Sequence, residues 1–156
     1  GFCYMERDQY QKALELFDLA HEVYSQKPEK NNKNFSNVAL WRGEIFQKLN
    51  DAEQSLKQLE MALHFAEKTE DYQQIANICK ELAAFHARHS DYKLAYQYQC
   101  KHDEYIERYH KDVDQRKQRE VEAKYEAEKK RQETELLELK ATRLQLKALR
   151  AQMNPH

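Results

Sequence analysis

The stretch Asp51-Ala-Glu-Gln-Ser55 decides the fold, because it signals where a helix begins and places a small residue near the start of that helix. An Asp at the N-cap accepts a hydrogen bond from a backbone N–H of the first turn, and a Gln three residues later can return one. Two other stretches carry the same signal, at Asp8/Gln11 and at Asp71/Gln74. We therefore predict helices that start near residues 9, 52 and 72.

Small residues recur along the chain at similar positions. Ala13, Ser55 and Ala95 are separated by 42 and then 40 residues, and Gly43 and Ala83 accompany the second and third of them. Small side chains suit close helix crossings, which leave no room for bulk. These units resemble tetratricopeptide repeats, and the resemblance implies about three helical hairpins. The third unit departs from the family pattern at Gln99 and His102.

The composition also predicts an all-α fold. Only two of the 156 residues are Gly and two are Pro, while 34% are charged and the mean hydropathy is -1.09, as expected for long, solvated helices. A net charge of -1 gives no electrostatic reason to expect nucleic acid as a partner. Three cysteines at unrelated spacings indicate reduced thiols, packed as small apolar residues in a cytoplasmic protein. No apolar run is long enough for a membrane segment, although an anchor elsewhere in a longer protein stays open.

A long helix is predicted to follow the repeats. Asp91 offers another N-cap, and no Gly or Pro occurs from there to Pro155, so one helix should continue to residue 153 over about 90 Å. Residues 111–135 are mostly charged, which is typical of a solvated connecting helix. The expected domains are the repeats (1–102), the connecting helix or coiled coil (103–138) and a terminal helix (139–156).

Leucines mark the terminal helix as a dimer interface. Leu139, Leu146 and Met153 recur every seven residues, and Leu149 holds the paired heptad position. A second apolar strip suits a four-helix bundle better than a simple two-stranded zipper. The second strip consists of Leu137, Ala141, Leu144, Ala148 and Ala151. We therefore expect a homodimer.

The chain ends with Gln152-Met-Asn-Pro-His156 after this leucine-rich helix. The ending resembles the phosphoacceptor box of LytS/YehU-type sensor histidine kinases. The resemblance implies that His156 accepts a phosphoryl group, with Asn154 and Pro155 shaping the helix end, and that a response regulator receives it. It also implies ATP and magnesium in a longer protein. This chain lacks the ATP-binding domain, carries no cofactor of its own and should be inactive alone, so whether it counts as an enzyme stays open.

The resemblance to tetratricopeptide repeats implies a concave surface that binds a peptide or protein. Its expected outward positions are Phe2, Met5, Asn37, Leu40, Glu44, Gln47, Asn77, Lys80 and Arg88. Asn77 and Lys80 resemble part of a groove that grips carboxylates, although matching residues in the other units are missing. Two alternatives remain: a non-catalytic adaptor dimerised by its coiled coil, and a peptide-sensing repeat protein without a kinase domain.

Four possible metal ligands lie on the two helices of the third unit: His86, His89, Cys100 and His102. Their spacing resembles no established metal site, so no metal is predicted. The chain also contains no Gly-rich phosphate loop and no Ser/His/Asp arrangement.

Overall fold

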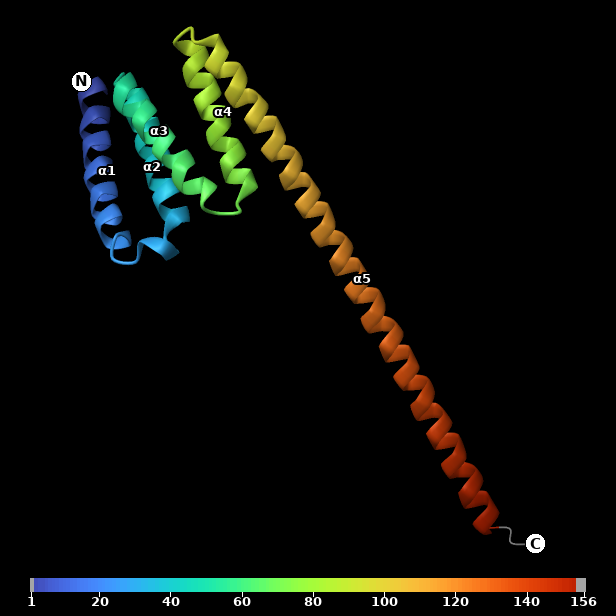
Figure 1. Cartoon of the computed structure of the whole chain (residues 1–156). Coiled ribbons are helices and arrows are strands. Elements are labelled where there is room, and N and C mark those ends of the chain that lie inside the picture. Colours follow the sequence, from blue (N-terminus) through green and yellow to red (C-terminus); the bar gives the residue numbers. More distant parts are fainter. Residues whose placement is uncertain (1, 154–156) are drawn as a thin grey trace. The chain divides into compact units, whose positions relative to one another are not determined.

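The protein is built from helices, as the sequence predicts (Figure 1). The computed structural model describes residues 2–153, with side chains described from Arg7 onward, and these residues contain no strand. The helices are α1 (Phe2–Tyr24), the short 3₁₀ turn η1 (Pro28–Lys30), α2 (Asn32–Lys48), α3 (Ala52–Glu67), α4 (Tyr72–Arg88) and α5 (Tyr92–Met153). Across residues 2–153, no helix combines the length and hydropathy that a membrane crossing requires.

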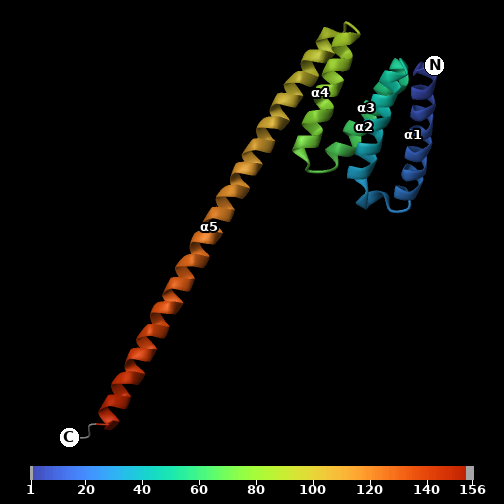
Figure 2. The same ribbon diagram turned by 180° about the vertical axis from the view of Figure 1, so that it is seen from behind.

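The chain divides into two compact units, residues 1–110 and 111–156. The first unit contains α1 to α4 and the beginning of α5, and α2 and α3 lie between α1 and α4 in both views (Figures 1 and 2). The second unit contains the rest of α5. The predicted long helix is confirmed, because α5 continues without a break from Tyr92 to Met153.

Aspartate caps begin three of the helices. Asp51 accepts a hydrogen bond from the Gln54 N–H at 3.1 Å, Asp71 accepts one from the Gln74 N–H at 3.1 Å, and Asp91 accepts one from the Leu94 N–H at 3.2 Å. The predicted starts near 52 and 72 are therefore correct.

The predicted start near residue 9 is wrong, because α1 is already helical at Phe2. Asp8 lies inside this helix, where its carboxylate is 3.6 Å from Lys12 Nζ one turn later. An Asp that could cap a helix can equally form an ion pair with a Lys four residues later. Asp8 forms such an ion pair with Lys12 and does not cap a helix.

The same tight turn joins α2 to α3 and α4 to α5. Asn50 and Ser90, 40 residues apart, both adopt positive φ, 58° and 61°. Each is followed by the capping Asp, whose N–H donates across the turn: Asp51 to Phe46 O and Asp91 to His86 O, both at 2.9 Å. Such left-handed residues satisfy carbonyls at a helix end and reverse the chain. The two helical hairpins thus repeat at the 40-residue spacing of Ser55 and Ala95.

A close helix crossing lies inside the first of these hairpins. Ser55 is fully buried and its hydroxyl donates to Gly43 O at 3.0 Å. A Cβ atom added to Gly43 would lie 3.1 Å from Leu59 Cδ2, a tight contact. The small residues at these positions therefore let α2 and α3 approach, and Leu59 fills the space beside them.

The core of the first unit extends from this crossing to α4. Buried residues from α2, α3 and α4 form one apolar cluster, and half-buried Tyr98 and Tyr105 of α5 pack against it. No residue of α5 is itself buried, and Ala95 is only half-buried, unlike its repeat counterpart Ser55. The hairpin of α4 and α5 is consequently packed through large aromatic side chains and lacks the close crossing of α2 and α3.

Truncation of the central leucine tests this description of the core. Leu59→Ala should lower the free energy of unfolding by about 2–5 kcal/mol, because it leaves a cavity at the crossing. Leu16→Ala on α1 is the matched control: Leu16 is 66% exposed, so its loss should change stability by less than about 0.5 kcal/mol. Urea denaturation followed by circular dichroism measures both, and equal losses would contradict the assigned core.

Candidate functional site

The proposed phosphoacceptor, His156, lies outside the described residues, as do Asn154 and Pro155. The structure describes the helix that leads to them, which ends at Met153. Their predicted roles remain predictions.

The leucines predicted to form a dimer interface lie on the second unit. Leu139, Leu146, Leu149 and Met153 are between 53% and 81% exposed. They project from a single helix on which every described residue from Asp114 onward is exposed. Large apolar side chains in such a row are costly to hydrate, so this strip is a candidate interaction surface.

Further apolar residues share the heptad phase of that strip. Tyr125 precedes Leu139 by two heptads, Val121 precedes Leu149 by four, and both are exposed. Polar residues, including Glu128 and Gln132, occupy the heptad positions between these apolar residues. They interrupt the apolar pattern, so the sequence of the charged stretch predicts a solvated face. The exposed Leu136 was also missed, because it belongs to neither predicted strip.

The predicted groove residues of the repeats divide into exposed and half-buried groups. Glu44 on α2 and Asn77, Lys80 and Arg88 on α4 are exposed. Leu40 is half-buried and packs against the core cluster, so it contributes to the fold more than to an open surface. The side chains of Phe2 and Met5 lie outside the described residues.

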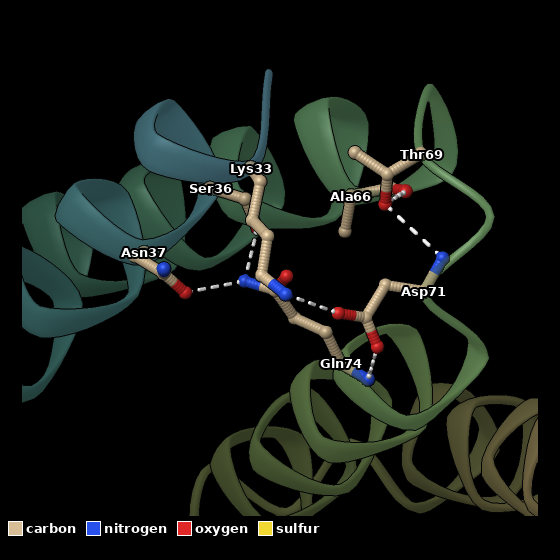
Figure 3. Close-up of polar contacts among 7 residues, drawn as sticks. All are labelled: Lys33, Ser36, Asn37, Ala66, Thr69, Asp71 and Gln74. Carbon is tan, nitrogen blue, oxygen red and sulfur yellow. Dashed lines mark hydrogen bonds and ion pairs between the residues drawn. The ribbon is translucent and has the colours of Figure 1, made fainter. Parts of the chain in front are cut away.

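Asn37 is held in a polar network that joins α2 to α4 (Figure 3). Gln74 Nε2 donates to Asn37 Oδ1 at 2.6 Å and to Ser36 Oγ at 3.1 Å, and the Ser36 hydroxyl donates to Ala62 O at 2.8 Å. The Gln74 side chain thus bonds across helices and does not return to Asp71. Asn37 consequently serves helix packing in this structure.

Asp71 anchors the other end of this network. Its carboxylate accepts from Lys33 Nζ at 2.9 Å as well as from the Gln74 N–H (Figure 3). Burial alone would raise the pKa of Asp71, but the Lys33 hydrogen bond, the backbone hydrogen bond and the charge of Lys33 together hold it below its ordinary value. The capping group therefore stays charged, and it ties the start of α4 to α2.

Two predicted groove residues, Gln47 and Arg88, line one hollow of about 250 Å³. It lies where the ends of α2 and α4 meet the first residue of α3, and its other lining residues are Asn50, Ala52, Phe85 and His89. Gln47 Nε2 is buried there without a hydrogen-bond partner in the described part of the chain. The structure thus brings together two of the predicted groove residues, one from α2 and one from α4.

The three histidines among the four possible metal ligands have other contacts. His86 stacks on Tyr98 with ring centroids 5.5 Å apart, and His89 stacks on Phe85 at 4.2 Å. His102 Nδ1 lies 2.9 Å from Ala76 O. Among the described side chains, from Arg7 to Met153, no three His, Cys, Asp or Glu residues gather in a way that could hold a metal ion.

Cys79 and Cys100 test the prediction that the thiols pack inside, whereas the side chain of Cys3 lies outside the described residues. Cys79 is fully buried, and burial together with nearby Glu67, against the opposing effect of Lys101, raises its thiol pKa to about 11. Cys100 is exposed, because α5 turns it away from the core cluster. The prediction of a buried thiol is therefore correct for Cys79 and wrong for Cys100.

A second hollow, of about 160 Å³, was not predicted from the sequence. It lies among α1, α2 and α3, and is lined by Asp18, His21, Phe35, Val38, Ala39, Arg42, Gln58 and Met61. Its signal in the sequence is weak: Arg42 directly precedes the crossing residue Gly43, and Gln58 occupies a buried position beside Leu59. A polar residue at a buried helix position indicates a binding site only when the residues that it faces on the neighbouring helices are known.

Comparison of the chain with protein-family models, with curated proteins and with solved structures finds no match.

The pKa of Glu44, one of the predicted groove residues, tests how the side chains of α2 and α4 are placed around it. Partial burial of its carboxyl group and the nearby charge of Glu81 raise the pKa of Glu44, although its side chain is largely exposed, and the charge of Lys48 partly offsets them. Folding then favours the protonated form, so this contribution to stability is present at low pH and is lost as pH rises through the pKa of the folded state. Glu81→Gln should lower the Glu44 pKa, and Lys48→Met should raise it further.

Titration of the Glu44 carboxyl carbon by NMR measures both shifts. Glu53→Gln removes an acid from α3 that does not act on Glu44, so it should leave the titration unchanged. An unchanged Glu44 pKa in Glu81→Gln would show that the two carboxylates do not face each other in solution.

Proposed function

We propose that the chain is the sensory and dimerisation region of a two-component sensor histidine kinase of the LytS/YehU type. The observation that carries the proposal is the row of exposed leucines on the last turns of α5, immediately before the sequence Asn154-Pro155-His156. A phosphoacceptor helix of this kind needs both features: an apolar strip for a partner helix and a histidine at its end.

The continuity of α5 supports a signalling role. It begins at a capped turn of the repeats and is hydrogen-bonded to Met153, with no Gly, Pro or loop to absorb a movement. A change at its first turns, where Tyr98 and Tyr105 pack on the repeat core, can therefore reach the leucine strip as a rotation or shift of the helix. We propose that a peptide or protein bound by the repeats supplies that change.

The chemistry proposed for His156 is nucleophilic. A neutral imidazole nitrogen attacks the γ-phosphorus of ATP, an N–P bond forms, and the bond to the ADP oxygen breaks. A separate ATP-binding domain supplies ATP with its magnesium ion, and an aspartate of a response regulator later takes the phosphoryl group. Pro155 has no N–H and disfavours a helical residue before it, so it helps to end the helix beside the ring.

The exposed strip is equally compatible with an adaptor that dimerises through α5 and carries no kinase activity. The two functions share the interface and differ at His156. Dimer formation and phosphorylation are therefore tested separately.

The dimer is tested by polar replacement within the leucine strip. Leu146→Asn together with Leu149→Asn should convert a concentration-dependent dimer into a monomer, because each leucine buried in the interface contributes about 1.5–3 kcal/mol. Light scattering over a range of protein concentrations measures the mass. Val121→Asn is the control and should weaken the dimer less, since its nearest seam neighbours are polar.

An unchanged mass in the double variant would refute the leucine interface. A larger effect of Val121→Asn would place the main contacts in the charged stretch.

The phosphoacceptor is tested in the longer protein that contains the kinase domain. Incubation with labelled ATP should produce an acid-labile, alkali-stable label, as expected for phosphate on nitrogen, and His156→Gln should abolish it while the dimer mass persists. Gln keeps a polar side chain of similar length but has no nucleophilic nitrogen. Label retained in His156→Gln would refute the assignment, and a stable dimer that is never labelled would favour the adaptor.

A further inference from the structure

The hollow among α1, α2 and α3 contains a hydrogen-bonding group that the fold does not satisfy. Arg42 Nε is buried and lacks an acceptor within the described part of the chain. Gln58 lines the same hollow and is only 6% exposed. An unsatisfied buried donor is destabilising, so an acceptor bound in this hollow would stabilise the Arg42 side chain.

The remaining walls give the hollow a mixed character. Phe35, Val38 and Met61 contribute apolar surface. Asp18 lies at the edge, where its exposed carboxylate pairs with Arg42 Nη1 and joins α1 to α2. The hollow therefore offers an apolar wall, a cationic donor with a neutral amide, and one carboxylate.

We propose that this hollow binds a small aliphatic amino acid as its zwitterion. The ligand carboxylate accepts hydrogen bonds from Arg42, whose buried Nε lacks an acceptor in the described part of the chain, and from the Gln58 amide. The ligand ammonium lies toward Asp18, and its aliphatic side chain contacts Phe35, Val38 and Met61.

Size and charge favour a small zwitterion. Pockets for drug-sized molecules measure about 300–1,000 Å³, whereas an apolar cavity of about 150 Å³ accepts a benzene-sized molecule, and this hollow measures about 160 Å³. A carboxylate without an ammonium group meets repulsion from Asp18, and an amine without a carboxylate offers Arg42 no acceptor. Both charges are needed together. The site is independent of the proposed kinase function, because it requires neither α5 nor His156.

The experiment titrates the full 156-residue chain with three probes of the same shape: leucine, 4-methylpentanoate, which lacks the ammonium group, and leucinamide, which lacks the carboxylate. The side-chain amide signals of Gln58 are followed by NMR, and affinity is measured by calorimetry. Leucine should bind and shift the Gln58 signals, 4-methylpentanoate should bind more weakly, and leucinamide should not bind. N-acetyl-alanyl-leucine distinguishes a peptide C-terminus from the free amino acid and should be weaker than leucine.

Gln58→Met keeps the size of the side chain and removes its hydrogen bonds, so leucine affinity should fall at least about tenfold. Gln54→Met is the matched control on the same helix, outside the hollow, and should change affinity less than about twofold. Circular dichroism confirms that both variants fold. The proposal is overturned if leucine leaves the Gln58 signals unmoved, if leucinamide binds as well as leucine, or if both variants bind leucine equally.

Discussion

The first unit depends on the close approach of α2 and α3. Gly43 and Ser55 provide the space for that approach, the Ser55 hydroxyl bonds Gly43 O across it, and Leu59 occupies the centre. Because the two helices lie so close, the buried side chains of α3 reach α4 on the other side and form one continuous core. The polar network from Ser36 to Gln74 can exist only because this packing brings the start of α4 beside α2.

Local chemistry explains which parts of the fold were predictable. The starts of α3, α4 and α5 each depend on an Asp that bonds a backbone N–H three residues later, so nearby sequence contains the whole interaction. The predicted helix start at Asp8 was wrong for a related reason. The nearby sequence cannot distinguish an Asp that caps a helix from one that forms an ion pair with a Lys one turn later. The length of α5 was predictable because its sequence contains no Gly or Pro, the residues that interrupt helices.

Contacts between distant residues explain what was not predictable. Asn37 meets Gln74 across 37 residues, and no short pattern indicates that its amide is already engaged. Gln47 and Arg88 were selected separately as groove positions, and only the packed helices show that they line one hollow. Gln58 and Arg42 line one hollow only because three helices are placed around it, and the role of His156 depends on residues beyond those described.

The ion pairs of α5 have a consequence for solution behaviour. Arg116 with Asp112, and Arg131 with Glu128 and Glu135, are all solvent-exposed pairs between neighbouring turns of one helix. Such pairs contribute only a few tenths of a kcal/mol each, and they weaken as the Debye length falls to about 8 Å at 0.15 M salt. The apolar core of the repeats has no such dependence. Ionic strength therefore acts on the charged part of α5 through these pairs, and on the first unit through the partly exposed Lys33–Asp71 and Arg42–Asp18 pairs, while the apolar contacts of the core do not depend on charge.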